Sequence, residues 1–392
     1  MSKSRFFNPV SGNETIHAPV GWWQSGNGFQ IKGKARKGAE SKVILGLDLG
    51  YGYVKVTSDG RTVHTFPSIV GSGKERQFSG LFGSGRGLDE MAVEIDGKTY
   101  YVGELAVAES YDASRAIDRN KTHHEATRVL VAAAILLAQP PVGEPIKLFT
   151  GLPLEYVREQ KDVFAATLQE MRFTAKGTSG PFQGVEREIR FDTVKVLPQA
   201  IGAAYAALMD EQGRPRYPEL AVVEDPMALI DIGYRTTDFT VFQVRPRLRV
   251  LEELSGTVAV GAHTVYNMVR AAFPEIPERD VESAVSRENI WINGRTLDLR
   301  REVAEVRKSV AKTIADEVKH RWSDRMGRIR VVFLAGGGAK LLQSELQTLH
   351  PDVRLVPVPQ GANALGFWLM GRMAEIPKET AGPPRLMVPQ QA

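Results

Sequence analysis

Two short stretches of the chain place an aspartate and glycines at a turn between apolar segments. The first is LGLDLGYGYVKV, residues 45–56, and the second is LIDIGYRTTDFTVF, residues 229–242. A glycine turn directs several backbone N–H groups into one concavity, which binds phosphate oxygens because no Cβ blocks their approach. The chemistry that this pattern indicates is recognition of a phosphorylated ligand.

The first turn combines donors with one carboxylate. Backbone N–H groups from Gly50 to Tyr53 would face a phosphate, and Lys55 adds a point charge suited to it. Asp48 cannot contact a phosphate directly, because like charges repel. Its position makes sense if Mg²⁺ or its water shell lies between the carboxylate and the phosphate.

The second turn repeats the argument. Asp231 stands where Asp48 does, and Gly233, Thr236 and Thr237 would donate N–H and hydroxyl groups. Asp238, at the end of this turn, is placed to orient or deprotonate a water molecule. One Asp-x-Gly turn is most often an ordinary hairpin, but two copies in matching contexts indicate a shared site.

A third glycine stretch, FLAGGGAKLL at residues 333–342, follows a β-branched segment and opens a predicted helix. Gly336, Gly337 and Gly338 would let a flat group approach the backbone closely. The spacing is neither the dinucleotide fingerprint nor a P-loop. The alternative is a tight strand-to-helix turn without a ligand.

Strands that alternate with helices must position these turns, which predicts an α/β fold with mixed sheets. Helices are expected at residues 123–138, 261–273 and 299–322, and a hairpin at 92–104. The chain also repeats itself, because the small-residue helix QAIGAAYAALM returns as QGANALGFWLM. We therefore expect two lobes that face one cleft.

The composition and the two ends of the chain restrict the kinds of site and the class of protein that are possible. The 392 residues carry a net charge of +4 and no cysteine, which excludes disulfides, thiolate metal sites and cysteine nucleophiles. The longest apolar run, residues 129–138, is too short to cross a bilayer. The start lacks the apolar core of a signal peptide. We therefore expect a soluble, cytoplasmic protein without direct membrane insertion.

Residues 1–41 are rich in Gly, Lys and polar residues and show no structural period, which predicts a flexible basic extension. This extension is either a tail without function, a contact for a filament or a DNA adaptor, or a segment that docks on the folded body through Trp22 and Trp23. Residues 376–392 are Pro-rich and predict a flexible C-terminal tail.

Five stretches, in order, resemble the five motifs of the actin-like ATPase superfamily. LDLGYGYVK and IDIGYRTTDF look like its phosphate motifs, LPQAIGAAYAAL and GANALGFWLMG like its connecting helices, and LAGGGAKLL like its adenosine motif. They span Ile44 to about Met373. GYGYVKV, TFPSIVG, FTGLPLEY and NALGFW look most like the ParM-type plasmid-segregation branch and its archaeal relatives.

The resemblance implies an actin-like fold of two lobes, each built on a mixed β-sheet flanked by helices. Lobe I would comprise residues 42–200, with a small inserted subdomain at about 62–115, and would be completed by a C-terminal helix at 361–375. Lobe II would comprise residues 201–360. Small residues on the two connecting helices would permit close crossing and a shear between the lobes.

The resemblance also implies Mg²⁺ with ATP or ADP in the cleft, with GTP as the alternative. Asp48 and Asp231 would hold the metal through water, and Gln199 would position the attacking water. Gly261 matches a glycine on the nucleotide side, and residues 301–312 offer candidates for contact with the base or ribose. The remaining donors carry over to phosphate or adenosine: Gly50, Tyr51, Gly52, Lys55, Gly233, Thr236 and Thr237, and Gly336, Gly337 and Gly338.

This chain departs from the ParM pattern at Gln199, where ParM-type proteins carry glutamate and actin carries glutamine. Because glutamine orients water but is a poor base, hydrolysis would be slow, or Asp238 would share the role. Tyr234 and Arg235 replace small residues that are common in this turn. Arg235 either stabilises phosphate charge or faces solvent.

The resemblance implies a nucleoside-triphosphate hydrolase that polymerises with itself into a cytoskeletal filament, most simply for plasmid DNA segregation through a DNA-binding adaptor. Alternatives are a filament that scaffolds another cargo, a non-polymerising ATP-binding assembly factor, and a small-molecule kinase of the same fold.

Overall fold

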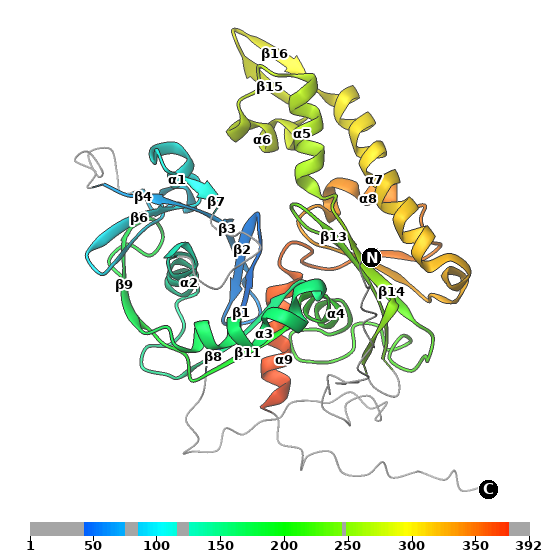
Figure 1. Cartoon of the computed structure of the whole chain (residues 1–392), viewed down its shortest axis with the longest axis horizontal. Coiled ribbons are helices and arrows are strands. Elements are labelled where there is room, and N and C mark those ends of the chain that lie inside the picture. Colours follow the sequence, from blue (N-terminus) through cyan, green and yellow to red (C-terminus); the bar gives the residue numbers. More distant parts are fainter. Residues whose placement is uncertain (1–42, 75–84, 116–124, 245–247, 376–392) are drawn as a thin grey trace, which may run out of the picture.

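The computed structural model describes residues 43–74, 85–115, 125–244 and 248–375, arranged as two lobes with a sheet at the centre of each (Figure 1). The predicted extension at 1–41 and the predicted tail at 376–392 lie outside the described residues. Among the described residues, none of the helices has the length and apolar character that a bilayer span requires.

The sheet of lobe I has the strand order β11-β8-β1-β2-β3. β1 pairs antiparallel with β2 and parallel with β8, so its carboxyl end opens into the turn that carries Gly50. Every residue of β1 is buried, as expected for a central strand with both faces covered. The strands are β1 (Val43–Leu49), β2 (Tyr53–Thr57), β3 (His64–Pro67), β8 (Ile146–Leu152) and β11 (Thr193–Pro198).

A second sheet, of order β10-β9-β5-β6-β4-β7, lies across the helix α2 (Glu125–Ala138) from the first, and α2 contacts strands of both sheets (Figure 1). The expected hairpin is present as β5–β6, with Asp96 and Gly97 at positive φ. β9 and β10 join this sheet, so it extends beyond the predicted insertion at 62–115. Its strands are β4 (Ile69–Ser72), β5 (Ala92–Ile95), β6 (Lys98–Val102), β7 (Ser114–Arg115), β9 (Phe173–Ser179) and β10 (Glu186–Ile189). The helices of this half are η1 (Leu88–Glu90), α1 (Glu104–Glu109), α2 (Glu125–Ala138) and α3 (Leu154–Gln169).

Lobe II repeats the central arrangement of lobe I, with strand order β14-β13-β12-β17-β18. β12 pairs antiparallel with β13 and parallel with β17, as β1 pairs with β2 and β8, which confirms the predicted repeat. The strands are β12 (Met227–Ile232), β13 (Thr237–Gln243), β14 (Arg249–Val258), β17 (Val332–Ala335) and β18 (Val353–Leu355).

Helices and one hairpin flank this sheet, and α5 and α7 fall where the sequence predicts them. They lie on the right of Figure 1, with the hairpin at its upper edge. They are α5 (Ala262–Ala272), η2 (Glu278–Asp280), α6 (Val281–Arg287), β15 (Asn289–Ile292), β16 (Arg295–Asp298), α7 (Arg300–Trp322), η3 (Ser323–Arg328) and α8 (Ala339–Leu346).

The two small-residue helices cross between the lobes. They are α4 (Gln199–Leu208) and α9 (Ala362–Ala374), and α9 also packs on β1 and β8. Their backbones are so close that a Cβ built on Gly366 would lie 1.7 Å from the carbonyl oxygen of Gly202. The predicted close crossing is therefore present, and it joins the cores of the two lobes.

Candidate functional site

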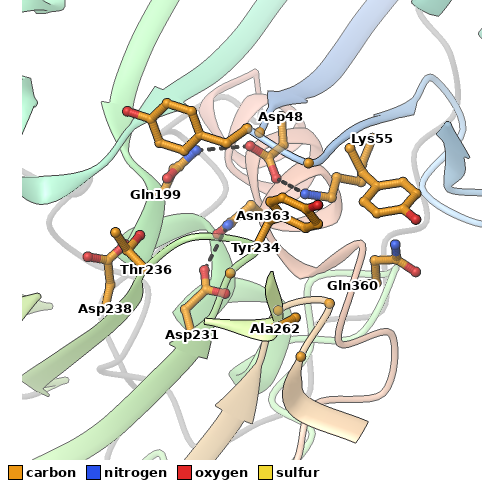
Figure 2. Close-up of a pocket in the computed structure, with 18 of the residues that line it drawn as sticks. Asp48, Lys55, Gln199, Asp231, Tyr234, Thr236, Asp238, Ala262, Gln360 and Asn363 are labelled. Carbon is orange, nitrogen blue, oxygen red and sulfur yellow. Dashed lines mark hydrogen bonds and ion pairs between the residues drawn. The ribbon is translucent and has the colours of Figure 1, made fainter. Parts of the chain in front are cut away.

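A cavity of about 80 Å³ lies between the lobes, and both acidic turns line it (Figure 2). Asp48 is at the end of β1 and Asp231 at the end of β12, so the two carboxylates come from opposite lobes and face one hollow. Thirteen of the fifteen residues singled out from the sequence line it: Asp48, Gly50, Tyr51, Gly52, Lys55, Gln199, Asp231, Gly233, Thr236, Asp238, Gly336, Gly337 and Gly338.

Asp48 is fixed by two partners. Lys55 Nζ lies 3.1 Å from Asp48 Oδ2, and Gln199 Nε2 donates to Asp48 Oδ1 at 2.9 Å. The pair with Lys55 follows from the register of the β1–β2 hairpin, which places the two residues opposite each other. The Asp48 residue, which is only 2% exposed, therefore has its carboxylate between the Lys55 ammonium and the Gln199 amide. All three side chains line the cavity.

Gly50 makes this turn possible. Its N–H donates to the carbonyl of Tyr53 at 3.1 Å, and a Cβ there would lie 2.9 Å from Lys55 Nζ. A side chain would therefore push Lys55 away from Asp48. Glycine here keeps both the backbone donors and the lysine close to the cavity.

Asp231 is buried and accepts a hydrogen bond from Asn363 Nδ2 at 2.9 Å. Burial raises the pKa of Asp231, and the nearby charge of Asp48 raises it further, while Asn363 and Lys55 act in the opposite direction. A cation between Asp48 and Asp231 would favour the ionised form of both carboxylates.

Asn363 is a site residue that sequence reasoning missed. Besides donating to Asp231, its Oδ1 accepts from the backbone N–H of Ala203 at 3.1 Å, so one side chain connects β12, α4 and α9. Asn363 is the one polar residue of the stretch GANALGFW, but this feature alone does not indicate a ligand. A buried amide of this kind requires partners.

Asp238 lies on β13 directly opposite Asp231 and lines the cavity. Burial raises the pKa of Asp238 to about 7, with smaller contributions from the charges of Asp231 and Glu155, although the Thr257 hydroxyl donates to it. A carboxyl group that titrates near neutrality is suited to exchanging a proton with water.

The raised pKa of Asp238 gives a pH-dependent stability. An unfolded aspartate has a pKa of about 3.8, so between that value and about 7 the folded chain holds the proton more tightly. The free energy of unfolding therefore falls as pH rises through this window. Without nucleotide or metal, Asp238→Asn should have a higher urea midpoint than the parent at pH 8, and this difference should be smaller at pH 5.

Asp298→Asn is the matched control, because hydrogen bonds from Arg300 lower the pKa of Asp298 to about 2. Its ionised form is favoured in the folded state, so this variant should be no more stable than the parent at pH 8. Equal midpoints for Asp238→Asn and the parent at both pH values would contradict the assignment.

The glycine stretch after β17 packs on the second turn. Gly336 has a φ of 89°, and a Cβ there would lie 2.4 Å from Asp231 Oδ1. The N–H of Gly338 donates to the carbonyl of Ile232 at 2.9 Å. The consecutive glycines are therefore needed for close packing on β12, and their open side faces the cavity.

Three expectations need correction. Thr237 is fully buried outside the cavity lining, and its hydroxyl donates to the carbonyl of Val260. Gly261 does not line the cavity but caps α5 beside the second turn, where a Cβ would lie 2.8 Å from the carbonyl oxygen of Gly233. No residue of 301–312 reaches the lining within the described part of the chain, and Glu282 of α6 does so instead.

Aromatic side chains line part of the cavity. Tyr234 packs closely on Gly52, since a Cβ built on Gly52 would lie 2.6 Å from the Tyr234 ring. The same ring stacks on the His263 ring, with the two ring centroids 4.8 Å apart. Arg235 is exposed and lies over the Tyr51 ring at 5.7 Å. Because ligand pockets usually measure about 300 Å³ or more, the lobes must separate or Tyr234 must turn to admit a nucleotide.

A hydrogen bond from the Tyr53 hydroxyl to Glu282 Oε1 at 2.7 Å joins two residues of the cavity lining that come from opposite lobes. Tyr53→Phe removes it without changing the ring, so nucleotide release should be faster by roughly threefold to tenfold. Stopped-flow release of a fluorescent nucleotide analogue measures this rate. Tyr100→Phe removes a similar Tyr–Glu bond within lobe I and should leave it unchanged. Equal release rates for all three proteins would contradict a role for this contact.

Two family models match the chain in sequence order. The N-terminal domain model of actin like proteins matches residues 46–202, and the C-terminal model of the archaeal actin homologue MreB-like matches residues 229–348. The chain belongs to the actin-like superfamily. The two matched segments each contain one acidic turn.

Individual relatives agree with this actin-like assignment. An archaeal actin homolog of Thermoplasma volcanium is 24% identical over 336 residues, which cover 83% of this chain and 97% of the relative. The structure of a 15-stranded ParM filament from Clostridium botulinum is 28% identical with a TM-score of 0.76, and covers 85% of this chain and 99% of that one. An archaeal actin homolog in complex with ADP has a TM-score of 0.67 at 20% identity, over 84% of this chain and 99% of that one.

Proposed function

We propose that this actin-like chain binds Mg²⁺ and ATP between its lobes, hydrolyses the nucleotide slowly and polymerises with itself into a filament. The observation that carries the proposal is the meeting of Asp48 and Asp231, from opposite lobes, on one cavity that also contains Lys55 and Gln199. The ADP complex of one actin-like neighbour and the filament formed by another support it.

The donor set fits Mg²⁺. In the ranges that the structure describes, no three Asp, Glu or His side chains gather to form a complete metal cage. Mg²⁺ usually takes one or two carboxylates, several waters and the phosphates of its substrate, which matches two separated aspartates. Asp48 and Asp231 would hold the ion, and its charge would neutralise the phosphate oxygens.

The chain's own residues would bind and position the reactants. Gly50 and Gly233 would shape the two turns, since their N–H groups already donate to the carbonyls of Tyr53 and Thr236. The backbone N–H of Gly52 would donate to a phosphate oxygen, and Lys55 would add its charge. Gln199 already donates to Asp48 and would orient a water through its amide oxygen. Because glutamine is a poor base, Asp238 would accept the proton, which its pKa of about 7 permits.

Nucleotide would control assembly because it contacts both lobes. A triphosphate held by the first and second turns favours the closed arrangement about the crossing of α4 and α9. Loss of phosphate after hydrolysis would remove this connection between the lobes, and the contacts of the polymer would then weaken. A DNA-binding adaptor that links the filament to plasmid DNA in the cytoplasm is the partner and cargo that we propose.

Sedimentation with Mg²⁺ and ATP, ADP, GTP or no nucleotide tests the proposal. We expect pelleting at tens of micromolar protein with triphosphate, and phosphate release without any added acceptor. The preferred base is the one whose triphosphate supports assembly at the lower protein concentration. Phosphate release without pelleting would indicate a non-polymerising ATP-binding assembly factor. Transfer of the phosphoryl group to an added small molecule, without release in its absence, would indicate a kinase.

A further inference from the structure

Asn363 is a buried polar side chain in the first turn of α9 that lines the cavity beside Asp231. Both polar atoms of its amide are used. Nδ2 donates to Asp231 Oδ2 at 2.9 Å, drawn as a dashed line in Figure 2, and Oδ1 accepts from the backbone N–H of Ala203 at 3.1 Å. One side chain therefore joins a carboxylate of the site to the crossing of α4 and α9.

The orientation of this amide is fixed by its two partners. A backbone N–H can only donate, so the amide atom that faces Ala203 must be the oxygen, and Nδ2 must face Asp231. The other carboxylate oxygen of Asp231, Oδ1, lies beside Gly336, where a Cβ would be only 2.4 Å away. Because glycine leaves space there, Oδ1 is the oxygen that remains for a cation or its water shell.

The two aspartates of the site differ in how firmly they are held. Asp48 has two partners, Lys55 and Gln199. Within the ranges that the structure describes, the amide of Asn363 is the only group that donates a hydrogen bond to the Asp231 carboxylate. Loss of this amide would leave the Asp231 side chain without a partner that sets its orientation.

Both aspartates are also connected to the same helix. Gln199, the first residue of α4, donates to Asp48 Oδ1 at 2.9 Å. Ala203, about one turn further along α4, donates to Asn363 and through it is linked to Asp231. A helical turn keeps these two points at a constant separation, although the aspartates themselves belong to opposite lobes.

We infer that Asn363 is a positioning residue for the metal–triphosphate, because it holds the Asp231 carboxylate in the orientation that receives Mg²⁺. The inference rests on the proposed function, since it requires Mg²⁺ and a nucleotide in the cavity. Removal of a hydrogen-bonding partner that orients a metal-binding group usually lowers metal affinity by about tenfold to hundredfold. A residue that only packed the crossing of α4 and α9 would affect nucleotide binding equally with and without Mg²⁺.

The part of the nucleotide affinity that depends on Mg²⁺ tests the inference. This Mg²⁺ gain is the ratio of the affinities for a fluorescent ATP analogue measured with Mg²⁺ and with EDTA. Asn363→Ala should lower the gain by roughly tenfold or more, while the affinity in EDTA changes by less than about threefold. Asn363→Leu keeps the branched shape of the side chain and should give the same result, which excludes an effect of the space left by alanine.

A double variant identifies Asp231 as the group through which Asn363 acts. Because Asp231→Asn already lacks the carboxylate charge, the further change Asn363→Ala should alter the Mg²⁺ gain by less than about twofold. Ser255→Ala is the matched control. Ser255 is also buried in lobe II and accepts from a backbone N–H, that of Val241 at 3.1 Å, but it does not line the cavity, so this variant should keep the parent's gain.

Urea unfolding without nucleotide shows which variants fold. If the parent has no Mg²⁺ gain, the proposed function itself is wrong. If the parent has the gain and the two Asn363 variants keep it, lose affinity equally with and without Mg²⁺, or add fully to the effect of Asp231→Asn, the inference is overturned. It is also overturned if neither Asn363 variant folds, since the amide would then be required by the fold and not by the metal.

Discussion

Asp231→Asn should reduce nucleoside-triphosphate turnover by about 10²–10³-fold, the loss expected when one charged group that stabilises the reacting phosphate is removed. Asp231 faces the same cavity as Asp48, and both carboxylates are needed to hold a metal–triphosphate between the lobes. Asparagine keeps the shape of the side chain, and its amide oxygen can still accept from Asn363. Phosphate release at saturating Mg²⁺ and ATP measures the effect.

The stability of Asp231→Asn shows whether a loss of turnover comes from the site or from unfolding of the chain. Burial raises the pKa of Asp231, so its ionised form costs free energy in the folded chain, and the neutral asparagine removes that cost. The urea midpoint of Asp231→Asn without nucleotide should therefore equal or exceed that of the parent at pH 8. Asp298→Asn, which changes an exposed aspartate, should keep full turnover. A loss below threefold for Asp231→Asn would contradict the proposed site.

The two acidic turns could be predicted because each is a local pattern. An apolar run, Asp-x-Gly and a second apolar run specify a strand, a turn and a strand, and the structure contains both hairpins. Their meeting across one cavity follows from the repeat, since two similar halves present equivalent edges. The resemblance to actin-like proteins predicts the other features of the fold, namely the bounds of the lobes and the roles of the two connecting helices.

The periodicity of a strand explains the error at Thr237. β13 begins at this residue, and successive side chains along a strand point to opposite faces. Thr236 and Asp238 therefore line the cavity, while Thr237 between them is buried against Val260. The sequence pattern predicts a turn that runs through Asp238, but β13 begins two residues earlier than this prediction requires.

Asn363 and Glu282 could not be assigned from the chain alone, because their roles depend on contacts between distant segments. Asn363 is 132 residues from Asp231 in sequence, and Glu282 is 229 residues from Tyr53. Neither lies in a turn whose local pattern signals a ligand. Their positions become visible only once the lobes are placed around the crossing of α4 and α9.

That crossing carries the second large effect, because Gly366→Ala should destabilise the folded chain by about 3 kcal/mol. The added methyl group would lie 1.7 Å from the carbonyl oxygen of Gly202, a backbone atom that cannot turn aside. The helices α4 and α9 must therefore move apart. The better helix propensity of alanine offsets only about 1 kcal/mol of this cost. Urea unfolding should show a lower midpoint with an unchanged slope.

Separation of the helices should also weaken nucleotide binding, because Asn363 lies one helical turn from Gly366 and holds both Ala203 and Asp231. Any shift of α9 away from α4 pulls this amide from at least one of its partners. Gly327→Ala is the matched control, since nothing lies within 4 Å of a Cβ there, and it should change neither stability nor affinity. If Gly366→Ala keeps the parent's midpoint and nucleotide affinity, the crossing tolerates a wider spacing and does not couple the lobes in this way.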